Sequence, residues 1–315
     1  MSDVKLSSAR IVSAQSLRII LRERTVTLLA GLFAVLVLVS AYLGWSATST
    51  VNAIYVDAVV YLQGAGQAVP PNPVNDISPL SLMRNMSTYV SLIGVLAAIV
   101  IGYQLISADR KSGILPLIGS RPVERFAYAS GKISALAKAN GVLMGVATLI
   151  AVGSLLILPS VSPGAMGWVK LLAFFALSFS YMMLFGLLAM ATAASSRSQS
   201  VGLLVPVTIW LTVTFILPSL TANIHPTAAI NPISALAPPP DTAFFNWTGW
   251  LLGPLSVAES FKYLAAGLLD YLPATVRVRS MLPPLPDLLL ALTGAGWLAV
   301  RGLSRMDMTR GDYDV

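Results

Sequence analysis

The sequence predicts an all-α membrane protein with six transmembrane helices and both termini in the cytoplasm. The chain is 56% hydrophobic but only 10% charged. Thirty-one residues without a formal charge separate Lys138 from Lys170, and comparable uncharged stretches recur along the chain. A bilayer's hydrocarbon core is about 30 Å thick, so a helix needs about 20 apolar residues to cross it. Six spans use nearly all of residues 1–315, which we therefore treat as one membrane domain.

The first predicted element is an amphipathic helix over residues 7–22. Four apolar residues recur there at helical spacing: Ile11, Ala14, Leu17 and Leu21. Arg10 and Arg18 flank this stripe, a pattern typical of a helix that lies at the membrane surface. A soluble extension of the first span fits the pattern equally well.

Six spans follow. We predict them at residues 25–43, 86–107, 139–158, 168–191, 201–220 and 286–303. The first is longer than the apolar core of a signal peptide, about 7–15 residues, and lacks a clear small-residue cleavage site, so we expect an uncleaved helix. The last has only thirteen uncharged residues between Asp287 and Arg301. The charged side chains at both ends must therefore reach along the helix to the membrane surface.

Two outer loops are predicted at residues 45–84 and 221–286, and one inner loop at residues 109–132. The second outer loop contains an extracytoplasmic helical segment with four apolar residues on one face: Ala258, Phe261, Ala265 and Leu268. Glu259 and Lys262 lie off the centre of this face, which favours an interfacial helix over a span. Because Gly253-Pro254 precedes the segment, a re-entrant helical pair is an alternative.

The orientation follows from the Lys and Arg residues. With both termini inside, 15 of the 20 Lys and Arg residues lie on the cytoplasmic side, as the positive-inside rule requires. This asymmetry and the attraction of basic residues to anionic headgroups account for the net charge of +7, so we predict no nucleic-acid partner. We predict a multi-pass protein of the bacterial inner membrane.

The residues offer little catalytic chemistry. There is no Cys, and the first five spans carry no charge away from their ends, which argues against an ion-driven carrier. Gly131-Lys132 is not a nucleotide-binding loop, because Phe126 and Ile133 stand where that motif needs Gly and Ser or Thr. We therefore predict no catalytic, metal-binding or cofactor-binding residues in this chain.

The inner loop is the segment most indicative of function. Its centre, residues 114–118, is apolar, and five charged residues flank it: Arg110, Lys111, Arg121, Glu124 and Arg125. An apolar strip between charges suits docking of a soluble partner. A short interfacial helix that only turns the chain is the alternative.

The loop also resembles a family pattern, Glu…Gly-Thr-Leu…Ser-x-Pro-x-x-Arg…Gly-Lys, of the permeases of type-2 ABC transporters. The matching residues are Asp109, Gly113, Leu115, Ser120, Pro122, Arg125, Gly131 and Lys132. The topology is also similar to that family, and within it to the permease of the nitrous-oxide-reductase copper-site maturation system. Asp109 replaces the usual Glu, Ile114 replaces the usual Thr, and Pro116 interrupts the apolar run, so the shape of the loop is expected to differ.

The resemblance implies a permease subunit of an ATP-driven exporter, with residues 113–125 as a coupling helix. ATP would be bound by a separate ABC ATPase subunit, with no cofactor in this chain. Other implied partners are a second permease copy in a homodimer, membrane lipid and a periplasmic protein. The predicted ATPase-coupling residues are Asp109, Arg110, Gly113, Leu115, Ser120, Arg121, Pro122, Glu124, Arg125, Gly131 and Lys132.

Two other classes remain open. A membrane anchor or assembly scaffold for a respiratory or periplasmic enzyme would explain six spans without a charged path. It would not explain the apolar and basic inner loop. An intramembrane protease or lipid transferase needs paired catalytic groups at membrane depth, and we find no Asp, Glu, His or Cys there.

Overall fold

The computed structural model describes residues 2–72, 74, 78–111, 124–157, 163–221, 241–272 and 284–306. These residues form helices and short connections, and no strand occurs among them. The main helices are α1 (Ser2–Arg22), α2 (Arg24–Gly64), α3 (Arg84–Tyr89), α4 (Val95–Lys111), α6 (Arg125–Ile157), α7 (Ala165–Ser195), α8 (Gln199–Leu211), α9 (Leu217–Thr221), α10 (Ala243–Leu252), α11 (Val257–Leu268) and α12 (Pro284–Arg305). The predicted all-α class is confirmed.

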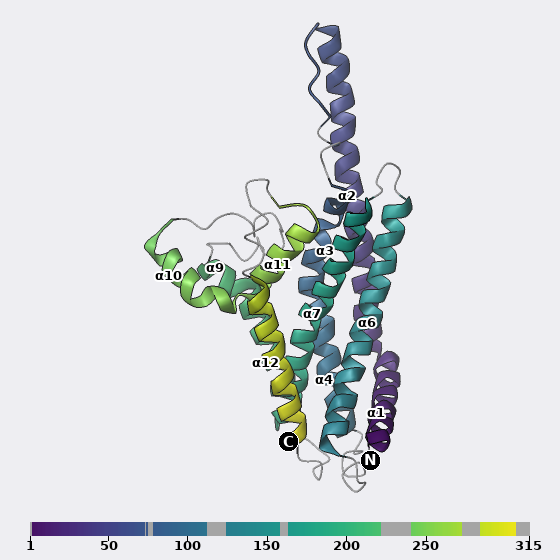
Figure 1. Cartoon of the computed structure of the whole chain (residues 1–315), viewed down its shortest axis with the longest axis vertical. Coiled ribbons are helices and arrows are strands. Elements are labelled where there is room, and N and C mark those ends of the chain that lie inside the picture. Colours follow the sequence, from purple (N-terminus) through teal and green to yellow (C-terminus); the bar gives the residue numbers. More distant parts are fainter. Residues whose placement is uncertain are drawn as a thin grey trace.

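Five helical stretches in the described ranges are long and apolar enough to cross a membrane, which confirms a multi-pass membrane protein. They are Arg24–Gly64, Pro79–Arg110, Arg125–Ile157, Ala165–Ser195 and Gln199–Thr221. Two of them contain a π-helical turn, Val90–Gly94 in the second and Thr212–Ile216 in the fifth. The helix at the predicted sixth span, α12, has 22 residues and runs beside α7 (Figure 1).

The long helix α7 lies in the middle of the bundle and contacts α4, α6, α8 and α12 (Figure 1). Small residues permit this packing. A Cβ atom on Gly102 of α4 would collide with the carbonyl oxygen of Gly186 on α7. A Cβ atom on Gly302 of α12 would lie 3.2 Å from the carbonyl oxygen of Ala191. Close backbone approach at small residues is a common way for helices to associate in lipid.

The first outer loop differs from the prediction, because α2 continues to Gly64 as a helix of 41 residues. Bilayer thickness limits how much of a helix is in lipid but does not end the helix, and no proline follows until Pro70. Tyr42 and Trp45 lie against each other at the position expected for an aromatic belt, with ring centroids 6.1 Å apart. Beyond them α2 projects away from the other helices (Figure 1).

The N-terminal segment forms a helix, α1, and of its predicted apolar stripe only Leu17 packs, partly buried, against the core. Ile11 and Leu21 are exposed, whereas Ser13, Ser16 and Ile20 are buried. Small side chains on that face let α1 run lengthwise beside the first half of α6 (Figure 1). The exposed stripe remains suited to lipid.

The predicted extracytoplasmic helical segment is α11. Three residues of its predicted apolar face, Ala258, Phe261 and Ala265, are buried, and the Phe261 ring stacks on Tyr181 of α7 at a centroid distance of 4.2 Å. Lys262, predicted off the centre of the face, is buried as well. A turn at Gly253–Leu255 joins α11 to α10.

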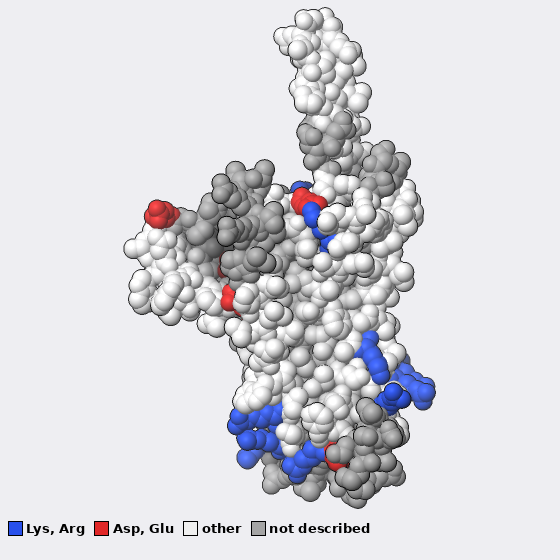
Figure 2. All heavy atoms as spheres, viewed as in Figure 1, with Lys and Arg blue, Asp and Glu red and all other residues white. Residues whose placement is uncertain are grey.

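Lys and Arg side chains gather at one end of the bundle, where the described chain begins and ends (Figure 2). We call this end the basic end. The basic residues near the start of α6 and at the ends of α4, α7 and α12 define it: Arg110, Arg125, Lys132, Arg197, Arg301 and Arg305. The opposite end carries the smaller cluster that includes Lys170 and Asp270.

Candidate functional site at the basic end

A buried ion pair joins the end of α4 to the start of α6. The Lys132 Nζ atom lies 2.6 Å from Asp109 Oδ2, and their side chains are only 2% and 9% exposed. The resemblance singled out both residues, but the sequence did not predict that they touch. Because two charges taken out of water are costly, such a pair needs further polar partners to be favourable.

Those partners come from the same two helices. The Tyr128 hydroxyl donates a 2.8 Å hydrogen bond to Asp109 Oδ2. Lys132 Nζ donates to the carbonyl oxygen of Leu105 at 2.8 Å, and lies 5.4 Å from the centre of the Tyr128 ring. The ion pair therefore holds α4 and α6 together through several charge-assisted bonds.

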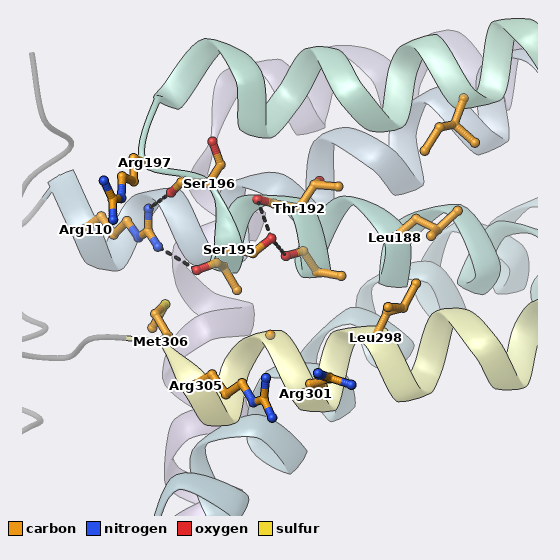
Figure 3. A pocket seen from close by; sticks show the side chains of 14 residues that line it. Arg110, Leu188, Thr192, Ser195, Ser196, Arg197, Leu298, Arg301, Arg305 and Met306 are labelled. Atoms are coloured by element: carbon orange, nitrogen blue, oxygen red, sulfur yellow. Dashed lines mark hydrogen bonds between the residues drawn. The ribbon is translucent and has the colours of Figure 1, made fainter.

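Arg110 ties α4 to the end of α7. Its two terminal nitrogens donate to the carbonyl oxygens of Ser196 and Ala194 at 2.7 and 2.8 Å (Figure 3). The carbonyl groups at a helix C-terminus lack partners within the helix and carry partial negative charge. A guanidinium placed there stabilises the helix end and fixes its position relative to α4.

Arg125 and Gly131 connect α6 to two more helices. The Arg125 guanidinium donates to the carbonyl oxygen of Ser304 on α12 at 3.1 Å. A Cβ atom on Gly131 would lie 2.9 Å from both the Ala9 carbonyl oxygen and the Val12 Cβ atom of α1. Glu124 is exposed just before α6 begins. The start of α6 is thus in contact with α1, α4 and α12.

The described part of the predicted inner loop is helical rather than a loop. Asp109 and Arg110 belong to α4, and residues 125–132 belong to α6. The other predicted coupling residues, Gly113, Leu115, Ser120, Arg121 and Pro122, lie outside the described residues. The six that are described lie at the end of α4 and around the start of α6, on either side of residues 112–123.

A cleft of about 760 Å³ opens beside this cluster, between α7, α8 and α12. Four arginines are among its lining residues: Arg110, Arg197, Arg301 and Arg305 (Figure 3). The prediction missed this cleft, because its residues come from elements far apart in the chain. The spacing of Arg301 and Arg305, four residues apart on one helix, was the available signal.

Among the described residues, no group of three or more His, Cys, Asp or Glu residues lies together. The basic end combines fixed helix ends with an exposed basic surface. This arrangement can transmit a displacement or hold an anion.

Comparison with known proteins identifies the chain. The family model described as "ABC-2 family transporter protein" matches residues 10–272. The chain belongs to this ABC-2 transporter family. It is therefore a membrane permease component of an ABC transporter, in agreement with the resemblance found in the inner segment. A search of curated proteins found no match to the chain.

Proposed function

We propose that this ABC-2 permease is the membrane subunit of an ATP-driven exporter and that a separate ABC ATPase subunit docks on its basic end. The positive-inside rule supports a cytoplasmic position for this end. ATP would be bound by the ATPase, with no cofactor held in the permease chain. The bacterial inner membrane fits this orientation.

The observation that carries the proposal is the Asp109–Lys132 pair. It joins α4 and α6 at the two ends of residues 112–123, the segment proposed to contact the ATPase. Arg110 extends the connection to α7, and Arg125 extends it to α12. A push on the segment would therefore move several helices as one body, the kind of rigid-body motion that switches transporters.

An exposed seam on α2 supports a homodimer. Seven apolar residues along α2 fall on two positions of a seven-residue repeat, with two repeats between Tyr42 and Val56, and are 36 to 74% exposed: Leu28, Leu32, Val35, Val39, Tyr42, Val56 and Val60. This spacing is typical of paired helices. A two-fold axis along the membrane normal would place the two α2 helices parallel and side by side.

The docking proposal can be tested by co-purification of the ATPase with tagged permease. The variant Arg121→Glu/Arg125→Glu should lose the ATPase, because it reverses the charge at the proposed contact. Arg10→Glu/Arg18→Glu makes the same change of charge on α1 and should retain it. Equal retention by both variants would place the contact elsewhere, whereas an ATPase absent from wild-type preparations would contradict the proposed function.

The homodimer proposal has its own test, which uses the absence of Cys from the chain. A single Val60→Cys substitution should give a disulfide-linked dimer in membranes under mild oxidation. Leu156→Cys, on an exposed site of α6, is the matched control and should stay monomeric on a denaturing gel. Cross-linking at residue 156 but not at residue 60 would contradict the proposed seam.

A further inference from the structure

Among the described residues, the charged groups that line the cleft at the basic end are all arginines. The 14 described lining residues include four arginines and no Asp or Glu. Arg110 is engaged with the end of α7, which leaves Arg197, Arg301 and Arg305 as the exposed basic residues of the cleft. A guanidinium group matches phosphate oxygens in geometry and can bind them through two parallel hydrogen bonds.

The two arginines of α12 lie one helical turn apart (Figure 3). Residues at this spacing are neighbours on a helix surface, and like charges there repel each other. The Arg301 guanidinium lies over the Trp297 ring at 4.8 Å from its centre, which orients it without neutralising its charge. An anion bound between Arg301 and Arg305 would remove their repulsion.

Away from the arginines and the serines at its mouth, the cleft has an apolar part. Leu188 on α7, Ile209 on α8 and Leu298 on α12 line it. Leu188 precedes Ser195 by seven residues, so the apolar part extends about 10 Å along the helix from the polar mouth. Ile209 and Leu298 are exposed on the cleft-facing helices. A free phosphate ion would leave this surface uncovered.

We propose that the cleft binds an anionic phospholipid, with the phosphate at Arg301 and Arg305 and an acyl chain along Leu188, Ile209 and Leu298. The basic end contributes the charge, and the groove between α8 and α12 contributes the apolar surface. Basic pockets between membrane helices are known to hold anionic headgroups on the cytoplasmic side. The proposed lipid contacts do not include Arg121 or Arg125, the two residues whose charge the docking test reverses.

Lipid binding to the full chain in nonionic detergent tests this proposal by native mass spectrometry. Phosphatidylglycerol should bind wild-type protein at one saturable site, and phosphatidylcholine should bind at least about tenfold more weakly. Arg301→Gln/Arg305→Gln should weaken phosphatidylglycerol binding by about tenfold or more, because it removes both positive charges proposed to hold the phosphate. Arg10→Gln/Arg18→Gln, the matched control on α1, should change it less than about threefold.

Two further measurements separate a lipid from other occupants. Ile209→Trp should fill the apolar part and weaken phosphatidylglycerol binding while all four arginines remain. Competition by inorganic phosphate at equal concentration should be absent. Equal losses in the arginine variant and its control, unchanged binding in Ile209→Trp, or full competition by phosphate would each overturn the proposal. Residues 307–315 contain three Asp residues, whose charge is opposite to that of the arginines. The proposal would also be overturned if the protein bound phosphatidylglycerol only after these residues had been removed.

Discussion

Two ion pairs of equal length hold the two ends of the bundle, but they lie in different surroundings. Lys132 and Asp109 at the basic end, like Lys170 and Asp270 at the opposite end, have a nitrogen–oxygen distance of 2.6 Å. The side chains of the first pair are 2% and 9% exposed, whereas those of the second are 35% and 30% exposed. Equal distances therefore do not mean equal contributions to stability.

The surroundings decide what each pair does. At the basic end, Tyr128 and the Leu105 carbonyl complete the bonding of a pair that is almost entirely buried. At the opposite end, Asp270 also accepts a hydrogen bond from Ser78 at 3.1 Å, but solvent screens its charge. Asp270 has a φ of 55°, a left-handed conformation that Asp tolerates at the end of a helix. The first pair locks helices together, and the second mainly fixes a turn.

The largest effect is expected from Lys132→Met. This change leaves Asp109 buried without its counter-ion and should destabilise the protein by about 3–5 kcal/mol. Thermal unfolding in detergent, followed by fluorescence size-exclusion chromatography, measures the loss. The second change Asp109→Asn in the same chain should restore much of the stability. If the double variant regains no stability, the unpaired charge of Asp109 is not the cause of the loss.

Gly131→Leu tests whether α1 is held firmly against α4 and α6, the two helices that the Asp109–Lys132 pair joins. The added side chain would meet Ala9 and Val12 of α1, and overpacking of this kind costs about 1–3 kcal/mol. Gly141→Leu is the matched control on the same helix, since a Cβ atom there meets nothing within 4 Å. Proteolysis of the N-terminal segment should be faster in the first variant only. Equal proteolysis rates in the two variants would show that the packing at Gly131 does not hold α1 in place.

Lys262 offers a test at the opposite end, where burial lowers its pKa to about 8 despite the opposing effect of Glu259. A folded-state pKa below the unfolded value of about 10.5 means that the unfolded chain binds more protons between these values. Stability should therefore rise as the pH increases from about 8 to 10.5. Lys262→Met should be more stable than wild type at pH 7 and should flatten this rise, measured by melting temperature. An unchanged slope would contradict the burial of a charged amine.

The smallest effect is expected from Lys170→Met. An exposed pair contributes about 0–1 kcal/mol, and salt screens it. The melting temperature of this variant should be within a few degrees of wild type, and the difference should vanish at high salt. A loss as large as that of Lys132→Met would remove the distinction between the two ends.

The sequence predicted the class and the location of the long helices, because uncharged stretches of sufficient length have few alternatives in a membrane protein. It did not predict that α2 continues to Gly64, since crossing a bilayer limits the apolar length but not the helix. It also did not predict that α1 packs on α6 through small residues such as Ser13 and Ser16, which lie off its apolar stripe.

The site was only partly predictable. Asp109 and Lys132 could be selected from the family pattern, but their contact depends on how α4 and α6 pack. Tyr128 lies one turn before Lys132 on α6, a signal that was overlooked. The arginine-lined cleft needs α4, the end of α7 and α12 in their final positions, which local sequence does not specify. The permease subgroup and the sixth span stay predictions.

Site-specific cross-linking from Glu124→Cys tests the central claim most directly, because the residue is exposed beside the locked helix ends and the chain has no other Cys. A short bifunctional cross-linker applied to native membranes should join residue 124 to a nucleotide-hydrolysing subunit, identified by mass spectrometry. An impermeant reagent should reach this residue only after the cells are opened. Labelling of residue 124 in intact cells, with no such subunit captured, would contradict the account.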